Sequence, residues 1–421
     1  ATLGIGSADG ITAGATTAGN IQTTGGRTFN SNATYVYNGT TNQVTGNGLP
    51  IAVQVLSISS FGTSGNNTVS LTTTNTTVER FNLNKGYFVA GTNGNLNIEV
   101  GGAIFGAGGF QPNDPISGTI TFKGSGKTEG TLTGYPHLYA VIINAGVNFN
   151  GDLLTESATI LNRLQINSGA FVQANAPYYT DGSSLIYNTN GVYGRNIEWG
   201  NSTGLQGYPH HVIVQGNTIL DLFTNPVNPA QLEIGGNLTI GNANGKGDVY
   251  MNNNMNKPLS VLGNIIIGSD GATSSVLQLS SNLGGDLWLS GSLTRYNTSF
   301  FNQNNRAVNL IGSTNATIST PGVSTPGVSS QDFNYLRLEK TGGASVSLEC
   351  AIGIINELSF TSGYIISSND NLLIFNDNAL AIGATATSFT NGPVKKIGND
   401  AFVFPVGKPE LFGPAGGGYR F

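Results

Sequence analysis

Charged residues are scarce in this chain of 421 residues, which contains 17 Lys and Arg against 22 Asp and Glu. Only 9% of its residues are charged, whereas ordinary soluble domains contain about 25%. The formal net charge of -5 and the lack of a basic cluster in the sequence argue against nucleic acid as a partner. Disordered chains combine low hydrophobicity with high net charge, so the 38% of apolar residues, set in short runs, indicates a folded protein.

Cysteine occurs once, as Cys350, so an intrachain disulfide is excluded. The residue ends an apolar-polar alternation that starts at Val346, and no histidine is near it in the sequence. A cysteine nucleophile needs an activating neighbour, usually a base, and no motif of that kind surrounds it. We therefore predict that Cys350 is a small strand residue.

Long apolar runs and helical patterns are also missing. No run approaches the roughly 18 to 20 apolar residues of a membrane helix, so we predict no membrane span. No stretch of about 12 residues combines a helical apolar period with good helix formers, because Gly, Asn or Thr interrupts nearly every candidate. Val53–Val55 and Leu336–Glu339 instead alternate apolar and polar residues, as strands with one buried face do.

The residues that are abundant, Gly, Asn, Thr and Ser, occur within repeated phrases. A Tyr-bearing strand, a glycine-rich gap, an aromatic residue or Leu before Pro, and another apolar strand follow one another in residues 33–56, 119–144 and 184–215. The stretch 231–310 is more regular, with similar glycine-containing segments at Gly236, Gly263 and Gly285, at spacings of 27 and 22 residues. Spacings of this size are typical of solenoid coils.

These features predict an all-β fold and favour a parallel β-helix, in which each coil buries its inward side chains by stacking on the next. An array of antiparallel β-sandwich-like units is the alternative, because short strands with frequent turn signals also fit it. We predict a solenoid with irregular repeats over residues 1–390, including a further unit at 333–380. Residues 391–421 indicate the start of a following β domain that is truncated here.

Three stretches carry longer recurring wording. They are Thr34–Pro50 (TYVYNGTTNQVTGNGLP), Leu336–Leu348 with its continuation Leu358–Ile365, and Asn391–Lys408 (NGPVKKIGNDAFVFPVGK). These stretches resemble phrases found in very large, repeat-rich surface proteins secreted by Bacteroidota. The resemblance extends from one end of the chain to the other, although the matched residues are a small minority of it.

The resemblance implies an extracellular, cell-surface protein of the adhesin or filament type, exported by the type IX secretion route, which some proteins of gliding motility also use. The implied partners are further copies or domains of the same long chain, the type IX secretion machinery, and surface polysaccharide. Proteins exported by this route carry a C-terminal sorting domain, whereas this chain stops at Gly418–Phe421 in what looks like a continuing strand. We interpret the chain as a fragment of a longer protein.

A carbohydrate-active β-helix enzyme, either a polysaccharide lyase or a glycoside hydrolase, is the alternative function. Glycoside hydrolysis needs paired carboxylates, and residues about one coil apart in sequence become neighbours in a solenoid. Asp248, Asp270 and Asp286 are therefore the candidates to test. Each lies beside a glycine, where a turn-forming Asp is expected, so we assign no catalytic residue.

The three histidines give little support for a metal site. His137 and His210 each follow Tyr-Pro in one of the phrases, and imidazole pairs bind zinc. The first phrase, however, has Ile51 after its Pro, whereas a site built by the repeat would occur in every copy. We predict polar, solvent-facing roles for His137, His210 and His211.

Calcium ligands are present only as scattered oxygens at Ser368–Asn371 and Asn376–Asn378, without an EF-hand loop. We therefore predict no metal ligand and no cofactor. The sequence as a whole predicts a non-enzymatic structural or adhesive segment, with a rigid stacked β scaffold that makes multivalent polar and aromatic contacts.

Overall fold

The computed structural model describes residues 1–14, 17–90, 94–98, 103–110, 118–123, 129–131, 137–144, 146–148, 159–172, 175–200, 205–222, 232–251, 253–270, 274–323, 325, 327–408 and 419–420. All regular secondary structure in these residues is β-strand, and they contain no helix. The chain divides into two compact units, one of residues 1–189, 196–199 and 204–209, and one of residues 190–195, 200–203 and 210–421. The boundary therefore falls within the third Tyr-bearing phrase.

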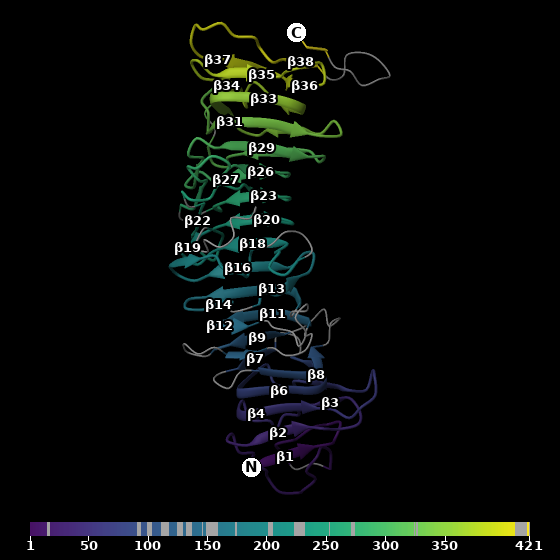
Figure 1. The fold of residues 1–421 in the computed structure, drawn as a ribbon. Helices are drawn as coiled ribbons and strands as arrows, with labels where there is room; N and C mark the ends of the chain where they lie inside the picture. The colour runs from purple at the N-terminus through teal and green to yellow at the C-terminus, as the bar shows by residue number, and fades with distance from the viewer. Residues whose placement is uncertain are drawn as a thin grey trace. The chain divides into compact units, whose positions relative to one another are not determined.

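Within each unit, strands of successive coils pair in parallel and form a β-solenoid. In the first unit, β1, β2, β4 and β6 lie one above another (Figure 1). The strands of this unit are β1 (Thr2–Ile5), β2 (Thr34–Tyr37), β3 (Gln43–Val44), β4 (Ala52–Ser59), β5 (Thr68–Ser70), β6 (Asn75–Val89), β7 (Asn95–Ile98), β8 (Ala103–Phe110), β9 (Thr119–Phe122), β10 (Glu129–Thr131), β11 (His137–Ile143), β12 (Gly146–Asn148), β13 (Thr159–Asn167), β14 (Phe171–Val172), β15 (Tyr178–Tyr179) and β16 (Ser184–Asn188). The predicted parallel β-helix is thus confirmed, and the antiparallel sandwich array is wrong.

The Tyr-bearing phrases build strands whose tyrosine side chains point inward. Tyr37 at the end of β2 is fully buried, and its hydroxyl donates to the carbonyl oxygen of Thr45 at 2.7 Å. Tyr187 in β16 is equally buried and donates to the carboxylate of Glu198 at 3.0 Å. In both coils the phenol therefore fastens the glycine-rich corner to the preceding strand. The second phrase lies in part outside the described residues.

Asparagine side chains reinforce the stacking of the first unit along one line. The amide of Asn167 donates to Asn144 Oδ1 at 2.8 Å, and the amide of Asn188 donates to Asn167 Oδ1 at 3.2 Å. Because an amide both donates and accepts, one residue per coil can continue such a line. This explains why Asn is abundant at coil ends.

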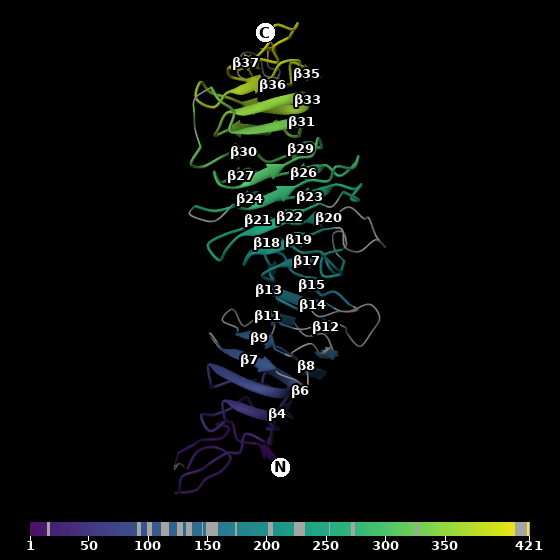
Figure 2. The ribbon, with the colours of Figure 1, turned by 90° about the vertical axis from the view of Figure 1, so that its left-hand side faces the viewer.

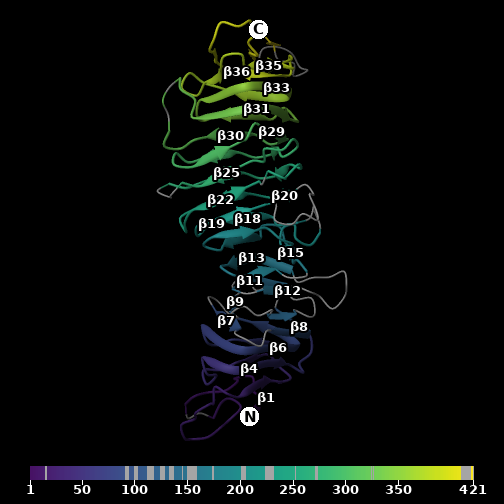
Figure 3. The same cartoon turned by 60° about the vertical axis from the view of Figure 1, so that its left-hand side comes forward.

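Three faces make up each regular coil of the second unit. Figure 2 shows β21, β24, β27 and β30 of one face in succession, and Figure 3 shows β19, β22 and β25 of another. The strands are β17 (Val192–Gly194), β18 (His211–Val214), β19 (Thr218–Asp221), β20 (Leu232–Ile234), β21 (Leu238–Ile240), β22 (Gly247–Tyr250), β23 (Leu259–Val261), β24 (Ile265–Ile267), β25 (Val276–Gln278), β26 (Leu287–Leu289), β27 (Leu293–Arg295), β28 (Phe300–Asn302), β29 (Ala307–Gly312), β30 (Ala316–Ser319), β31 (Gln331–Lys340), β32 (Ser345–Leu348), β33 (Ile352–Ile366), β34 (Leu373–Phe375), β35 (Leu380–Ile382), β36 (Ser388–Asn391), β37 (Val394–Lys396), β38 (Gly407–Lys408) and β39 (Tyr419–Arg420).

The three faces are named by their strands. Face 1 runs through β20, β23, β26, β29, β31 and β33, and face 2 through β18, β21, β24, β27, β30 and β32. Face 3 is the separate sheet β17–β19–β22–β25–β28. Successive strands along the chain alternate among the faces, so residues about one coil apart become neighbours.

The coil length differs from the sequence prediction at one step. Leu238, Ile265 and Leu293 are register partners, so the coils here contain 27 and 28 residues. The amide of Gly291 donates to the carbonyl oxygen of Gly263 at 3.0 Å, which makes Gly291 the next repeat position. The predicted 22-residue step to Gly285 is wrong, because Gly285 occupies a different corner, beside Ser280.

Inward side chains of stacked coils form continuous apolar columns. Leu238 and Ile265 are completely buried, and Leu293 is 1% exposed. Full burial of one such side chain contributes roughly 1.5 to 3 kcal/mol, and each coil supplies several. The columns therefore hold the coils together although individual strands are short.

The predicted boundary near residue 390 stays a prediction. Strand β37 still pairs in parallel with β34, while β38 and β39 form an antiparallel pair. The described residues contain no helix that is long and apolar enough to cross a membrane.

Candidate functional site

A line of polar side chains runs along the corner before face 2 of the second unit. His211 Nδ1 accepts from the amide of Asn237 at 2.9 Å, and Asn237 Oδ1 accepts from the amide of Asn264 at 2.8 Å. Asn264 Oδ1 accepts from Ser292 at 2.8 Å, and Ser292 Oγ accepts from Thr317 at 2.9 Å. Each side chain thus bonds to the main chain of the next coil, and we call this line the corner ladder.

His211 has a structural task as the first rung of the corner ladder. Burial, and then the adjacent His210, lower the pKa of His211 from its usual value, which favours the neutral ring whose Nδ1 can accept. The two rings meet edge to face with centroids 4.4 Å apart. His137 lies in the first unit at the start of β11, and its side chain is outside the described residues.

The three candidate carboxylates lie in different places. Asp248 in β22 is 2% exposed; its Oδ1 accepts from the amide of Val276 at 3.0 Å, and its Oδ2 pairs with Lys246 at 2.9 Å. Asp270 is exposed in the turn after β24. Asp286 precedes β26 on another face, and its Oδ1 accepts from the amide of Ala307 at 3.1 Å.

The register therefore does not stack these carboxylates. The partner of Asp248 in the next coil is Val276, whereas Asp286 leads into a strand that is paired with β23 and β29. Asp248 and Asp286 each hold a main-chain amide of the next coil. Among the residues that the model describes, no group of three His, Cys, Asp or Glu could hold a metal ion.

Cys350 lies just beyond the end of β32 and is 1% exposed. Burial raises the pKa of its thiol above the usual value, which disfavours the thiolate that a nucleophile requires. Its Sγ contacts the carbonyl oxygen of Ile318 at 3.7 Å. These observations describe a packed corner residue.

The oxygens considered for calcium already have a cation among them. Lys396 Nζ donates to the carbonyl oxygen of Asn376 at 2.9 Å, and it pairs with Asp400 at 2.6 Å. This hydrogen bond to Lys396 lowers the pKa of Asp400. The Ser368–Asn371 stretch closes a turn through a hydrogen bond of 3.2 Å from Ser368 to Asn371.

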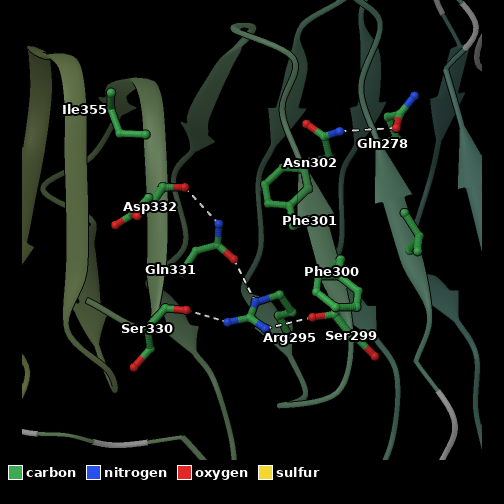
Figure 4. Close-up of a pocket in the computed structure, with 11 residues that line it drawn as sticks. Gln278, Arg295, Ser299, Phe300, Phe301, Asn302, Ser330, Gln331, Asp332 and Ile355 are labelled. Carbon is green, nitrogen blue, oxygen red and sulfur yellow. Dashed lines mark hydrogen bonds between the residues drawn. The ribbon is translucent and has the colours of Figure 1, made fainter. Parts of the chain in front are cut away.

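A pocket of about 720 Å³ opens on face 3 of the second unit, between β28 and the start of β31 (Figure 4). Ligand pockets generally have volumes of roughly 300 to 1,000 Å³. The walls combine apolar side chains with amides, a guanidinium and a carboxylate. They are Val276, Gln278, Arg295, Ser299, Phe300, Phe301, Asn302, Ser330, Gln331, Asp332 and Ile355.

Arg295 spans this pocket from the end of β27. Its Nε donates to Gln331 Oε1 at 2.8 Å and its Nη1 to the carbonyl oxygen of Ser299 at 2.8 Å, while its Nη2 donates to the carbonyl oxygen of Ser330. Figure 4 shows the guanidinium between these partners. Burial lowers the pKa of Arg295, yet a guanidinium stays protonated in proteins.

The pocket marks a break in the pairing of face 3. Strand β28 is the last member of its sheet, and the next coil places Gln331–Phe333 of β31 in the corresponding part of the chain, where they pair only with β33. Gln303 bridges the break, because its amide donates to Asp332 O at 2.6 Å and accepts from Asn334 N at 3.0 Å. Side chains replace main-chain pairing at this level.

A duplicated segment accounts for the break. The sequence Thr-Pro-Gly-Val-Ser occurs twice in succession, at residues 320–324 and 325–329. Each copy closes a turn, with hydrogen bonds of 3.1 Å from Val323 to Thr320 and from Val328 to Thr325. Gly322 and Gly327 have φ of 80° and 75°, as the third position of a type II turn requires. The added residues lengthen this coil before β31 begins.

Sequence reasoning missed this pocket. Its central contacts join Arg295 to Gln331, which is 36 residues away, and neither residue belongs to a motif. The duplicated Thr-Pro-Gly-Val-Ser is the signal that identifies the enlarged coil.

Comparisons of the chain with protein-family models, with curated proteins and with solved structures found no match in any of the three. The resemblance to secreted surface proteins of Bacteroidota therefore stays a prediction.

Proposed function

We propose that this chain is a structural or adhesive segment of an extracellular surface protein or filament. In this proposal the stacked coils provide a rigid support, and the chain acts without catalysis. The observation that carries the proposal is the use of polar side chains to join coils. His211, Asp248 and Asp286, which could have served chemistry, each accept a main-chain amide of a neighbouring coil.

Exposed aromatic side chains support the adhesive part of the proposal. Phe61 is 60% exposed in the first unit, and Trp288 and Phe300 are 40% and 61% exposed in the second. Aromatic rings on a surface of low charge offer contact area without electrostatic steering. Several weak contacts on one support give avidity that no single contact has.

Export by type IX secretion, polysaccharide at the cell surface and further copies of the chain belong to the same proposal. Immunogold electron microscopy of cells that produce the protein tests it. We expect gold on the outside of intact cells, at a density that does not rise after permeabilisation. Label that appears only after permeabilisation would refute an extracellular role. Regular fibres in the purified protein would favour the filament over the monomeric adhesin.

A further inference from the structure

We propose that the pocket between β28 and β31 binds an acidic glycan, with a carboxylate of the glycan on Arg295 and a sugar ring against Phe300. This inference rests on the proposed adhesive function and names a ligand class for it. It follows from the charge, the shape and the unfilled pairing of the pocket.

The charge of Arg295 calls for an anionic partner. All three acceptors of its guanidinium are neutral oxygens, and among the described residues no carboxylate forms an ion pair with it. Three of its five N–H groups are used in these contacts. A carboxylate on the remaining N–H groups would form charge-assisted hydrogen bonds, which are stronger than neutral ones.

Asp332 does not neutralise this charge within the protein. Its Oδ1 accepts from the hydroxyl of Ser329 at 2.6 Å and lies against Gly353, where a Cβ would collide with it. Figure 4 shows its carboxylate on the β31 side of the pocket, directed away from Arg295. The carboxylate of Asp332 is therefore placed to accept from a ligand hydroxyl.

The remaining wall suits a sugar ring. Phe300 is 61% exposed on β28, and the amides of Gln278 and Asn302 are joined at 3.2 Å on adjoining strands. An apolar ring face surrounded by amides, a hydroxyl and a carboxylate complements a molecule that has both C–H faces and hydroxyl groups. Carbohydrates have this pattern, whereas a purely apolar ligand would leave the polar wall unpaired.

An added peptide strand fits less well. The amide of Phe300 donates to Ser275, so the main-chain groups of its neighbour Phe301 face away from β25, toward the pocket. Across the pocket, however, Gln303 already occupies Asp332 O and Asn334 N. A strand in this position would find one edge open and the other capped.

Calorimetric titration of the whole purified chain tests the proposal. The probes are three uronate-containing fragments, from polygalacturonate, alginate and hyaluronate, each with its carboxyl-reduced, neutral counterpart. We expect at least one acidic fragment to bind, with its neutral counterpart about tenfold weaker or worse. Binding should also weaken as salt is added.

Two variants place the ligand, and a third serves as the control. Phe300→Ala removes an exposed ring and should weaken binding about tenfold while circular dichroism stays unchanged. Arg295→Gln should abolish the difference between acidic and neutral fragments. Trp288→Ala removes a 40% exposed ring on face 1, outside the pocket, and should leave binding unchanged.

No binding of any fragment would overturn the proposal, as would equal affinity for acidic and neutral forms. Equal losses in Phe300→Ala and Trp288→Ala would place binding elsewhere and overturn it too. Surface label in the microscopy without glycan binding would refute this inference alone, whereas absence of surface label would refute the proposed function.

Discussion

Gly263 provides a sharp test of how closely the coils stack. Its amide donates to the carbonyl oxygen of Gly236 at 2.9 Å, and its own carbonyl accepts from Gly291 at 3.0 Å. A Cβ at this position would lie 2.6 Å from Gly236 C and 2.7 Å from Gly236 O, and also against Asn237 Oδ1. These are main-chain contacts shorter than real Cβ atoms show, so the coils must separate in Gly263→Ala.

The expected loss can be estimated from its parts. Overpacking in a filled site costs about 1 to 3 kcal/mol, and a weakened hydrogen bond adds about 0.5 to 1.5 kcal/mol. We therefore expect Gly263→Ala to destabilise the surrounding coils by roughly 2 to 4 kcal/mol. Gly191→Ala is the matched control, because no heavy atom lies within 4 Å of its Cβ position and its φ is outside the left-handed region. The control should be neutral or slightly stabilising.

Hydrogen exchange is the suitable assay, because stacked repeats need not unfold in one step. Protection should fall in peptides that cover Gly236, Gly263 and Gly291 and remain unchanged in the first unit. Unchanged protection around Gly263, or an equal loss in Gly191→Ala, would refute the close stacking described here.

Three further changes test individual side chains. The pKa of His211 is lowered from 6.5, so the unfolded chain takes up a proton first, and the free energy of unfolding should fall as pH falls below 6.5; His211→Asn keeps an acceptor and should reduce this slope in urea titrations at several pH values. Burial lowers the pKa of Lys340 from 10.5, so stability should rise as pH increases toward 10.5; Lys340→Met should lack that rise in the same titrations, and an identical rise would contradict the assignment. Tyr37→Phe removes the hydrogen bond to Thr45 and should cost about 0.5 to 1.5 kcal/mol by thermal unfolding, whereas no loss would show that the phenol does not fasten its corner.

The fold class could be predicted because its signals are local. Alternation in Leu336–Glu339 places Leu336 and Leu338 in the core, as found in β31. The glycine repeat was correct from Gly236 to Gly263, where the two residues are joined by a hydrogen bond of 2.9 Å. It failed at Gly285, because a Gly-Gly-Asp-Leu corner of face 1 resembles a Gly-Asn corner of face 2 in sequence.

The pocket could not be predicted because it depends on the length of one coil. Arg295 and Gln331 meet only after the chain has completed a turn enlarged by the duplicated Thr-Pro-Gly-Val-Ser. The candidate carboxylates failed for the same reason. Their spacing of 22 and 16 residues is compatible with stacking only if every coil has that length, whereas Asp248 is 28 residues from its partner Val276.

Retention of surface polysaccharide by immobilised protein is the most direct test of the central claim, a non-enzymatic adhesive support. Beads that carry increasing densities of the intact chain are mixed with polysaccharide from the producing cells, and both retained and released sugar are measured. We predict retention that rises steeply with density, as multivalent contact requires, with no shortening of the polysaccharide. Retention at no density, or steady release of shortened fragments as from the alternative carbohydrate-active enzyme, would contradict the account.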